Sequence, residues 1–395
     1  THRVDWMPRV AGVDPGTKTF DLVVIEEGVV KAEQSIDTAA LARNPQILVD
    51  ALDSLEPDYI VAPSGYGVAP TSGDNIADSR RFAVEVLLLS TEEDIARGIE
   101  AGEIGIWVYD ALAKVVSHLV EKYRDRVLFL PAVIHLPTVP RYRKINKVDM
   151  GTVDKLASTF LAVHEIAEEQ GLDIDKVSII VAELGYGYAA CIAVDKGVVV
   201  DGIGGTYASI GTLTPGALDF ELVVGAREWS RWDVFHGGVF YAANTFDLDA
   251  IAKCYEEGEK VCIEIFEAFV EGVAKDIARA RVSTPKAELV VLTGRYSRNT
   301  AVVRLLKELL RDMSFTTLKG LKGASISKEA AQGYAAIGDG VIGGVFRDLV
   351  EHMRIGDACG TAVDYVVHPR ARGFVKRVKR AYLETVKKPR LCSET

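Results

Sequence analysis

The sequence predicts an α/β protein with two similar lobes, each a mixed β-sheet with helices, that face each other across a cleft. Three observations lead to this prediction. The chain has 395 residues, too many for one compact core, and 48% of them are hydrophobic. An apolar strand, an acid-x-glycine turn and a second apolar strand begin at Val10 and return from Ile179. Both copies then pass through a tight turn into a third strand and keep register for about twenty residues.

Acidic residues mark the first turn of each copy. Asp14-Pro15-Gly16 in the first copy corresponds to Glu183-Leu184-Gly185 in the second. Likewise, Glu26-Glu27-Gly28 corresponds to Asp195-Lys196-Gly197. A duplicated strand-turn-strand unit implies two half-molecules whose carboxylates meet over a shared cleft.

The first half of the chain alternates between strand and helix patterns. The elements expected there are strands at 10–13, 19–26, 29–35, 59–62 and 127–130, and helices at 46–54 and 91–123. The loop Ser64-Gly65-Tyr66-Gly67 follows a strand, so it would lie at the ligand-facing edge of the sheet, although an ordinary turn explains it equally well.

The second half repeats the three strands and continues with long helices. Expected there are a glycine-rich loop at 202–216, helices at 258–280, from 299 and at 327–350, and a strand at 288–292. We therefore predict an N-terminal lobe over 1–150, a C-terminal lobe over 151–345 and a helical tail over 346–395 that packs on the N-terminal lobe. Basic residues crowd the tail between His368 and Arg390, either as a solvated helix face or as a contact for an acidic partner.

Composition excludes several classes of function. The formal charge of −10 argues against a nucleic-acid-binding surface. Residues 1–6 form no apolar signal core, and no apolar run reaches the roughly 18 residues that span a bilayer. The five cysteines are scattered without a CxxC pair, so we expect free thiols and a cytoplasmic protein. Asn and Gln are scarce, a balance typical of heat-adapted proteins.

The first acidic turn has the residues of a phosphate-binding loop. Gly16 allows a phosphate to approach the backbone, while Thr17, Lys18 and Thr19 add two hydroxyls and a positive charge. Asp14 at the strand end suits hydrated Mg²⁺. A plain Asp/Gly hairpin turn would be the simpler interpretation of this loop alone. The paired turn from Glu183 onward favours the functional interpretation.

The paired turns resemble the two phosphate motifs of the sugar kinase, heat-shock ATPase and actin superfamily. Asp149-Met150-Gly151-Thr152 resembles the start of its first connecting helix, Leu292-Thr293-Gly294-Arg295 its adenosine motif, and 330–344 its second connecting helix. Leu-Gly-x-Gly followed by a Gly-Thr-rich loop is similar to the acetate and butyrate kinase branch. Within that branch, the chain most resembles an uncharacterised archaeal family grouped with butyrate kinases.

The resemblance implies two ribonuclease H-like lobes around a nucleotide cleft that binds ATP and Mg²⁺. It places the metal at Asp14 and Glu183 and the acceptor beside Asp149, the candidate catalytic base, although capping of the following helix is an equal alternative for Asp149. Arg143 and Lys147 would attract a small anionic acceptor, although a solvated charged loop is an equal alternative. The remaining nucleotide contacts would come from Gly16, Thr17, Lys18, Thr19, Gly185, Tyr186, Gly187, Gly294 and Arg295.

Departures from the family pattern leave two functions open. Acyl kinases carry an arginine in the loop after the second phosphate motif, whereas 211–216 has none and the nearest are Arg227 and Arg231. Tyr186 and Tyr188 stand where the superfamily has glycine and threonine. The chain is therefore expected to be an ATP-dependent kinase of a small carboxylate or, alternatively, a non-catalytic or weakly hydrolytic ATP-binding sensor. A homodimer is a candidate assembly.

Overall fold

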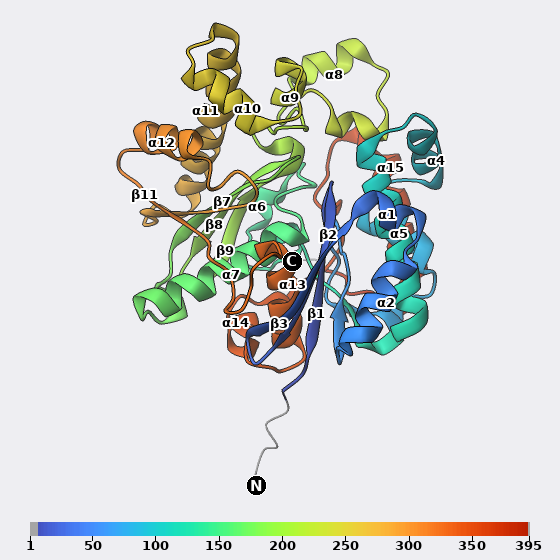
Figure 1. Ribbon diagram of the computed structural model, residues 1–395. Helices are drawn as coiled ribbons and strands as arrows, with labels where there is room; N and C mark the ends of the chain where they lie inside the picture. Colours follow the sequence, from blue (N-terminus) through green and yellow to red (C-terminus); the bar gives the residue numbers. More distant parts are fainter. Residues whose placement is uncertain (1–6, 394–395) are drawn as a thin grey trace.

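The computed structural model of the protein describes residues 7–393 and contains two mixed β-sheets with helices packed on them (Figure 1). Residues 1–6, which belong to the predicted N-terminal lobe, and residues 394–395 of the predicted tail lie outside the described residues. The expected absence of a signal core concerned residues 1–6 and therefore also lies outside them. Between residues 7 and 393, no helix has the length and apolar character needed to cross a bilayer.

The two sheets share one strand order. The first runs β3-β2-β1-β4-β6-β5 and the second, read from its other end, runs β9-β8-β7-β10-β11. In both, the first strand pairs antiparallel with the second and parallel with the strand that follows the hairpin meander. The strands are β1 Val10–Pro15, β2 Thr19–Glu26, β3 Val29–Asp37, β4 Tyr59–Val61, β5 Thr71–Ser72, β6 Val127–Phe129, β7 Ile179–Leu184, β8 Ala189–Asp195, β9 Val198–Ile203, β10 Leu289–Thr293 and β11 Ser314–Thr317.

The duplication extends to backbone angles. Glu27 and Gly28 turn with φ of 53° and 73°, and their counterparts Lys196 and Gly197 turn with 52° and 74°. Glycine adopts such positive angles without steric cost, which is why it closes both turns. The predicted α/β fold with two similar sheets is therefore confirmed.

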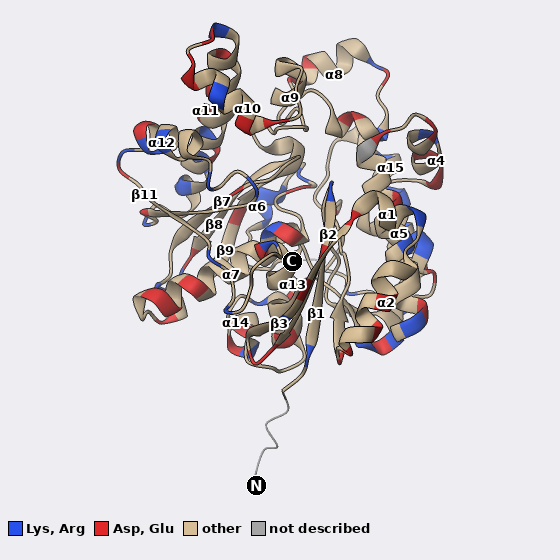
Figure 2. Cartoon of the chain, in the orientation of Figure 1, with Lys and Arg blue, Asp and Glu red and all other residues tan. Residues whose placement is uncertain are grey.

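Helices cover the sheets and separate them. In the first half these are α1 Thr38–Arg43, α2 Gln46–Leu55, α3 Ser79–Arg81, a π-helical turn Phe82–Leu87, α4 Glu92–Glu100, α5 Ile104–Tyr123, α6 Arg141–Lys144 and α7 Val153–Gln170. In the second half they are α8 Phe220–Ala226, α9 Val239–Ala243, α10 Leu248–Glu256, α11 Lys260–Ser283, α12 Thr300–Leu309, α13 Glu329–Val341, α14 Arg347–His352 and α15 Arg372–Thr385. Figure 2 shows charges of both signs on the helices α4 and α12.

Helices α7 and α13 pack against each other between the sheets, within a buried apolar cluster that also includes Val61 and Val181. Glycines permit this packing. A Cβ atom on Gly12 of β1 would lie 2.3 Å from the Ala331 carbonyl oxygen of α13. A Cβ atom on Gly333 of α13 would lie 2.2 Å from the Ala157 carbonyl oxygen of α7. Backbone contacts this close hold the two lobes in a fixed relation along α13.

Two expected long helices are each broken at a glycine. The helix expected over 91–123 is α4 followed by α5, because Gly102 turns with φ of 75° between them. The helix expected over 327–350 ends at Val341, and α14 begins at Arg347 after Gly343, whose φ is 92°. The division of the chain into lobes at 150 and 345 stays a proposal.

The tail helix α15 docks on the first lobe through one apolar face. Ala381, Tyr382 and Val386 join the buried cluster of that lobe, and Val386 forms a β-bridge with Ile76. The opposite face carries exposed Lys and Arg side chains.

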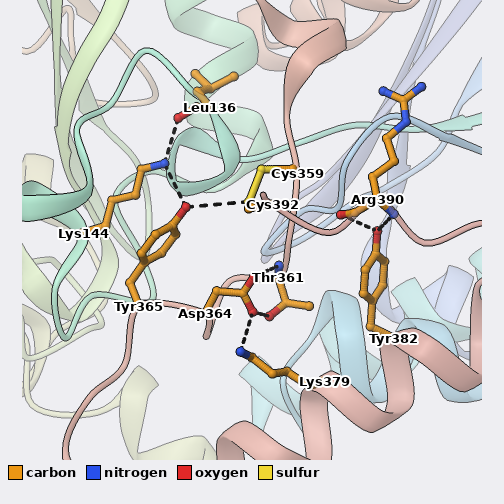
Figure 3. Close-up of a disulfide and its surroundings, with 10 residues drawn as sticks. All are labelled: Leu136, Lys144, Cys359, Thr361, Asp364, Tyr365, Lys379, Tyr382, Arg390 and Cys392. Carbon is orange, nitrogen blue, oxygen red and sulfur yellow. Dashed lines mark hydrogen bonds and ion pairs between the residues drawn. A yellow bond between two sulfur atoms is a disulfide. The ribbon is translucent and has the colours of Figure 1, made fainter. Parts of the chain in front are cut away.

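The expectation of free thiols is wrong for four of the five cysteines. Cys254 pairs with Cys262 and Cys359 with Cys392, while Cys191 is free and buried. The fold brings the paired Cα atoms to 5.7 Å and 5.0 Å, distances that no local spacing motif encodes. Figure 3 shows the second disulfide beside Tyr365, whose hydroxyl also accepts from Lys144 at 3.4 Å. With four cysteines paired, the cysteine pattern does not indicate a reducing compartment.

Gly333 offers a test of the joint between α7 and α13. Substituting Gly333→Ala is expected to lower the free energy of unfolding by about 1–3 kcal/mol, because the new methyl group collides with the Ala157 carbonyl oxygen. Gly373→Ala in α15 is the matched control, since nothing lies within 4 Å of its added Cβ atom, and it is expected to be neutral or stabilising by up to about 1 kcal/mol. Urea denaturation measures both, and equal effects would contradict the close backbone contact.

Candidate functional site

One cavity of about 630 Å³ is lined by both duplicated turns. Of the predicted site residues, its wall contains Asp14, Gly16, Thr17, Lys18, Thr19, Asp149, Glu183, Gly185, Tyr186, Gly187, Gly294 and Arg295. Residues from distant parts of the chain therefore surround one space.

The two turns face each other because equivalent strands carry them. Asp14 is the next-to-last residue of β1, and Glu183 occupies the same place in β7. A Cβ atom on Gly187 of the second turn would lie 3.7 Å from the Thr17 hydroxyl of the first. The carboxylates thus approach the cavity from opposite lobes.

Two lysines lie among the acidic groups. The Lys155 Nζ atom lies 2.5 Å from an Asp154 oxygen and 2.8 Å from the Glu183 Oε1 atom. The Lys328 Nζ atom lies 2.8 Å from the Asp14 Oδ2 atom. Each acid of the two turns therefore has a lysine partner inside the cavity.

Burial dominates the electrostatics of these acids. It raises the pKa of Asp14 to about 6, although Lys328 partly offsets the effect. It raises the pKa of Glu183 to about 7, again against the opposing effect of Lys155. Burial lowers the pKa of Lys155, but the combined effect of Asp154 and Glu183 is larger and raises that pKa above its ordinary value. The lysine therefore stays charged.

The acids retain capacity to bind a cation. The Asp14 Oδ1 and Glu183 Oε2 atoms are buried and accept no hydrogen bond from any described residue. Buried carboxylate oxygens without partners are costly, so a hydrated Mg²⁺ bridging to phosphate would fit this donor set. The backbone of the turn at Gly16 and Gly185 suits the phosphates of a nucleotide.

Asp149 contacts the second lobe directly. Its Oδ1 atom accepts a hydrogen bond from the Gly151 N–H at 2.9 Å, and a Cβ atom on Gly205 would lie 2.0 Å from its Oδ2 atom. Burial raises the pKa of Asp149 to about 6, while the Gly151 N–H and Lys155 oppose that shift. Position 205 therefore has to be glycine, because any side chain there would displace the Asp149 carboxylate.

The side chain of Tyr186 lines one side of the cavity. The Lys18 Nζ atom lies 4.4 Å and the Arg295 guanidinium 5.6 Å from the centre of its ring. Its hydroxyl donates to the Phe246 carbonyl oxygen at 3.4 Å. The phenol group is thus held at the edge of the second turn between two cations.

Two predicted residues do not line the cavity. Arg143 donates to the Val200 carbonyl oxygen at 2.6 Å, and the Lys147 Nζ atom lies 4.0 Å from the centre of the Tyr207 ring. Both side chains are engaged in contacts with the second lobe, so the geometry gives them no contact with an acceptor in this cavity.

Several cavity residues were missed by sequence reasoning. Asp154 lines the cavity and pairs with Lys155, although a carboxylate in the first turn of a helix is favourable without any such role. Lys155 is followed by the uncharged run 156–163, and this pattern was a usable signal that Lys155 lies in a buried helix. The positions of Lys328 and Tyr109 on the cavity wall have no local signal, because each depends on partners far away in the sequence.

Comparison with known proteins agrees with this geometry. Residues 12–368 match the family described as protein of unknown function DUF1464. The chain is 29% identical over 167 residues to acetate kinase 2 of Photobacterium profundum, covering 38% of this chain and 41% of that protein. It is 28% identical over 156 residues to a probable butyrate kinase of Bacteroides thetaiotaomicron, covering 37% and 44%. The chain thus spans less than half the length of these curated relatives.

Solved structures extend the likeness to the whole fold. Acetate kinase of Porphyromonas gingivalis superimposes with a TM-score of 0.54 and 14% identity over 84% of this chain and 98% of that one. A propionate kinase of Francisella tularensis gives a TM-score of 0.56 and 14% identity over 83% and 98%. The predicted resemblance is confirmed at the level of the two-lobed fold. The chain belongs to the DUF1464 family and has the two-lobed fold shared by acetate and propionate kinases.

Proposed function

We propose that this protein transfers the γ-phosphoryl group of ATP to a small carboxylate. The observation that carries the proposal is the meeting of the Asp14 and Glu183 turns over one cavity that also contains Asp149. Likeness in sequence to an acetate kinase and a probable butyrate kinase supports a kinase and a carboxylate acceptor. Catalysis would consist mainly of positioning and charge neutralisation.

Each group of cavity residues has a role in this proposal. Asp14 and Glu183 would hold Mg²⁺, which neutralises phosphate charge when bound. The backbone of both turns and Lys18 would bind the phosphates, and Gly294 and Arg295 would flank the adenosine. Lys155 and Lys328 keep the acids from repelling one another and lie within reach of the same cavity.

Asp149 would act as a positioning residue. A carboxylate acceptor is already ionised at neutral pH, so it has no proton for a base to remove. A hydroxyl acceptor would need that base. Burial raises the pKa of Asp149 to about 6, so below that pH its carboxyl group carries a proton and would donate a hydrogen bond that fixes one oxygen of the acceptor carboxylate.

A sensor that binds ATP without acceptor turnover is the second candidate. The position of Tyr186 favours it, because its ring is held between Lys18 and Arg295, the two cations that would otherwise contact nucleotide directly. Such a protein would close on nucleotide and report the closure to a partner. Small-angle scattering with and without Mg-ATP, combined with a turnover assay, separates the two candidates.

The kinase proposal is tested by a coupled ADP-release assay with a panel of short carboxylates. Turnover that depends on the acceptor is expected, and Asp149→Ala, which removes the hydrogen-bonding group, is expected to reduce kcat/KM at least about a hundredfold because the acceptor loses its fixed position. Asp357→Ala is the matched control, since the Asp357 side chain is 59% exposed and pairs with Arg354 on the surface. ATP binding with no acceptor-dependent ADP release would instead support the sensor.

The raised pKa of Asp149 predicts a pH-dependent difference in stability. Its pKa is about 6 in the folded protein and 3.8 in the reference state, so the folded state holds the proton more tightly between these values. As pH rises from 4 to 6 the wild type should lose about 1–3 kcal/mol of stability that Asp149→Asn does not lose. Denaturation of both proteins at about pH 4 and 7.5 without nucleotide gives the difference. A difference that does not change with pH would contradict the buried carboxyl group.

A further inference from the structure

Next to Asp149 the cavity wall changes character. Here it is formed by a set of side chains that we call the acceptor pocket: Tyr66, Leu88, Val108, Tyr109, Leu112, Tyr188 and Phe235. The Phe235 ring lies edge-on to Tyr109 and Tyr188, with ring centres 5.5 and 6.1 Å apart. Asp149 lies close enough to Tyr109 and Tyr188 to influence the pKa of both.

No lysine or arginine side chain lines the acceptor pocket itself. The cations on the cavity wall come from other segments, namely Lys18, Lys155, Arg295, Arg298, Lys319 and Lys328. Four of the seven pocket residues are Leu88, Val108, Leu112 and Phe235, which offer no hydrogen bond. The pocket therefore combines an apolar surface with three phenol hydroxyls.

One arginine stands behind these phenols. Arg231 donates from one nitrogen to the Tyr109 hydroxyl at 2.8 Å, to the Leu88 carbonyl oxygen at 3.1 Å and to the Tyr66 hydroxyl at 3.4 Å. Among residues 7–393 its guanidinium forms no ion pair with an acid. An arginine that is enclosed by phenols and has no anionic partner leaves a positive charge uncompensated beside the pocket.

Arg231 also orients the phenols. The oxygen atoms of Tyr66 and Tyr109 accept from Arg231, and the two hydroxyl groups lie close enough to hydrogen-bond each other, so at least one phenol hydrogen of the pair remains available to another acceptor. Burial raises the pKa of Tyr109 and Tyr188, so both keep their protons at neutral pH. Hydroxyl donors polarised by a cation suit a carboxylate.

We propose that the acceptor pocket selects a monocarboxylate with a branched or aromatic tail, longer than that of acetate. Its carboxylate would accept hydrogen bonds from Tyr66 and Tyr109, and its tail would pack on Val108, Leu112 and Phe235. The inference rests on the proposed phosphotransferase function. In the reaction a carboxylate oxygen forms a bond to the γ-phosphorus while the bond to the oxygen bridging to ADP breaks. An acyl phosphate and ADP result, without proton transfer, because the acceptor is ionised.

Sugars fit this surface poorly. Each hydroxyl placed against Leu88, Val108, Leu112 or Phe235 would lose its water without gaining a partner, which lowers affinity about tenfold per hydroxyl. Each apolar carbon that becomes buried there would instead raise affinity roughly fourfold.

The test compares acetate, isovalerate, phenylacetate and glucose with the full chain and Mg-ATP, by ADP release and by calorimetric binding. We expect kcat/KM and affinity for isovalerate and phenylacetate to exceed those for acetate at least about tenfold. A preference for acetate or glucose would overturn the inference. Acetate turnover would in that case still support the proposed function. Tight isovalerate binding without any turnover would support the pocket while the proposed function fails, and the absence of carboxylate binding would overturn the inference directly.

Variants distinguish the tail surface from the carboxylate contacts. Val108→Phe is expected to lower the ratio of kcat/KM for isovalerate over acetate at least about tenfold, because it narrows the tail surface. Val282→Phe is its control, since Val282 is 80% exposed, and should leave the ratio unchanged. Leu112→Ala enlarges the pocket and should shift preference toward phenylacetate, which keeps the inference testable if Val108→Phe does not fold. An unchanged ratio in both pocket variants would contradict it.

Arg231→Gln should raise KM for every carboxylate about tenfold or more while KM for ATP stays constant. Arg231→Lys keeps the charge and should restore part of the loss. If Arg231→Gln raised both KM values alike, a general structural role would replace the proposed one.

Discussion

The gathering of carboxylates around one cavity is the constraint on which the rest of the structure depends. Asp14, Asp149, Asp154 and Glu183 all line it, and their mutual repulsion in a buried space would oppose folding. Lys155 resolves part of this conflict by pairing with Asp154 of its own helix and with Glu183 at the end of β7. The packing around α7 and the arrangement of acids in the cavity therefore have the same physical origin.

The glycines of α13 determine how closely the lobes approach. At Gly12 and Gly333 the backbones of β1, α13 and α7 are in direct contact, so the turns that follow β1 and β7 have little freedom to separate. The same principle operates at Gly205, where a side chain would displace Asp149. Small residues thus position the charged ones.

The sequence was sufficient to predict features that repeat or that depend on local backbone chemistry. The duplicated hairpins, their glycine turns and the convergence of Asp14 and Glu183 on one cavity follow from the internal repeat. Two long helices were expected where glycines with positive φ interrupt them, because periodicity alone does not reveal a break. Contacts between distant segments were beyond prediction: Arg231 meets Tyr66 across 165 residues, and Cys359 meets Cys392 only because the tail returns to the loop after α14.

The glycine contacts along α13 and the side chains of the acceptor pocket belong to separate sets of residues. Side chains of α5 that line the acceptor pocket can therefore change in volume during evolution without disturbing the backbone contacts between β1, α13 and α7. Related chains that share these glycine contacts are free to differ in the shape of the acceptor pocket while the packing between the lobes stays constant.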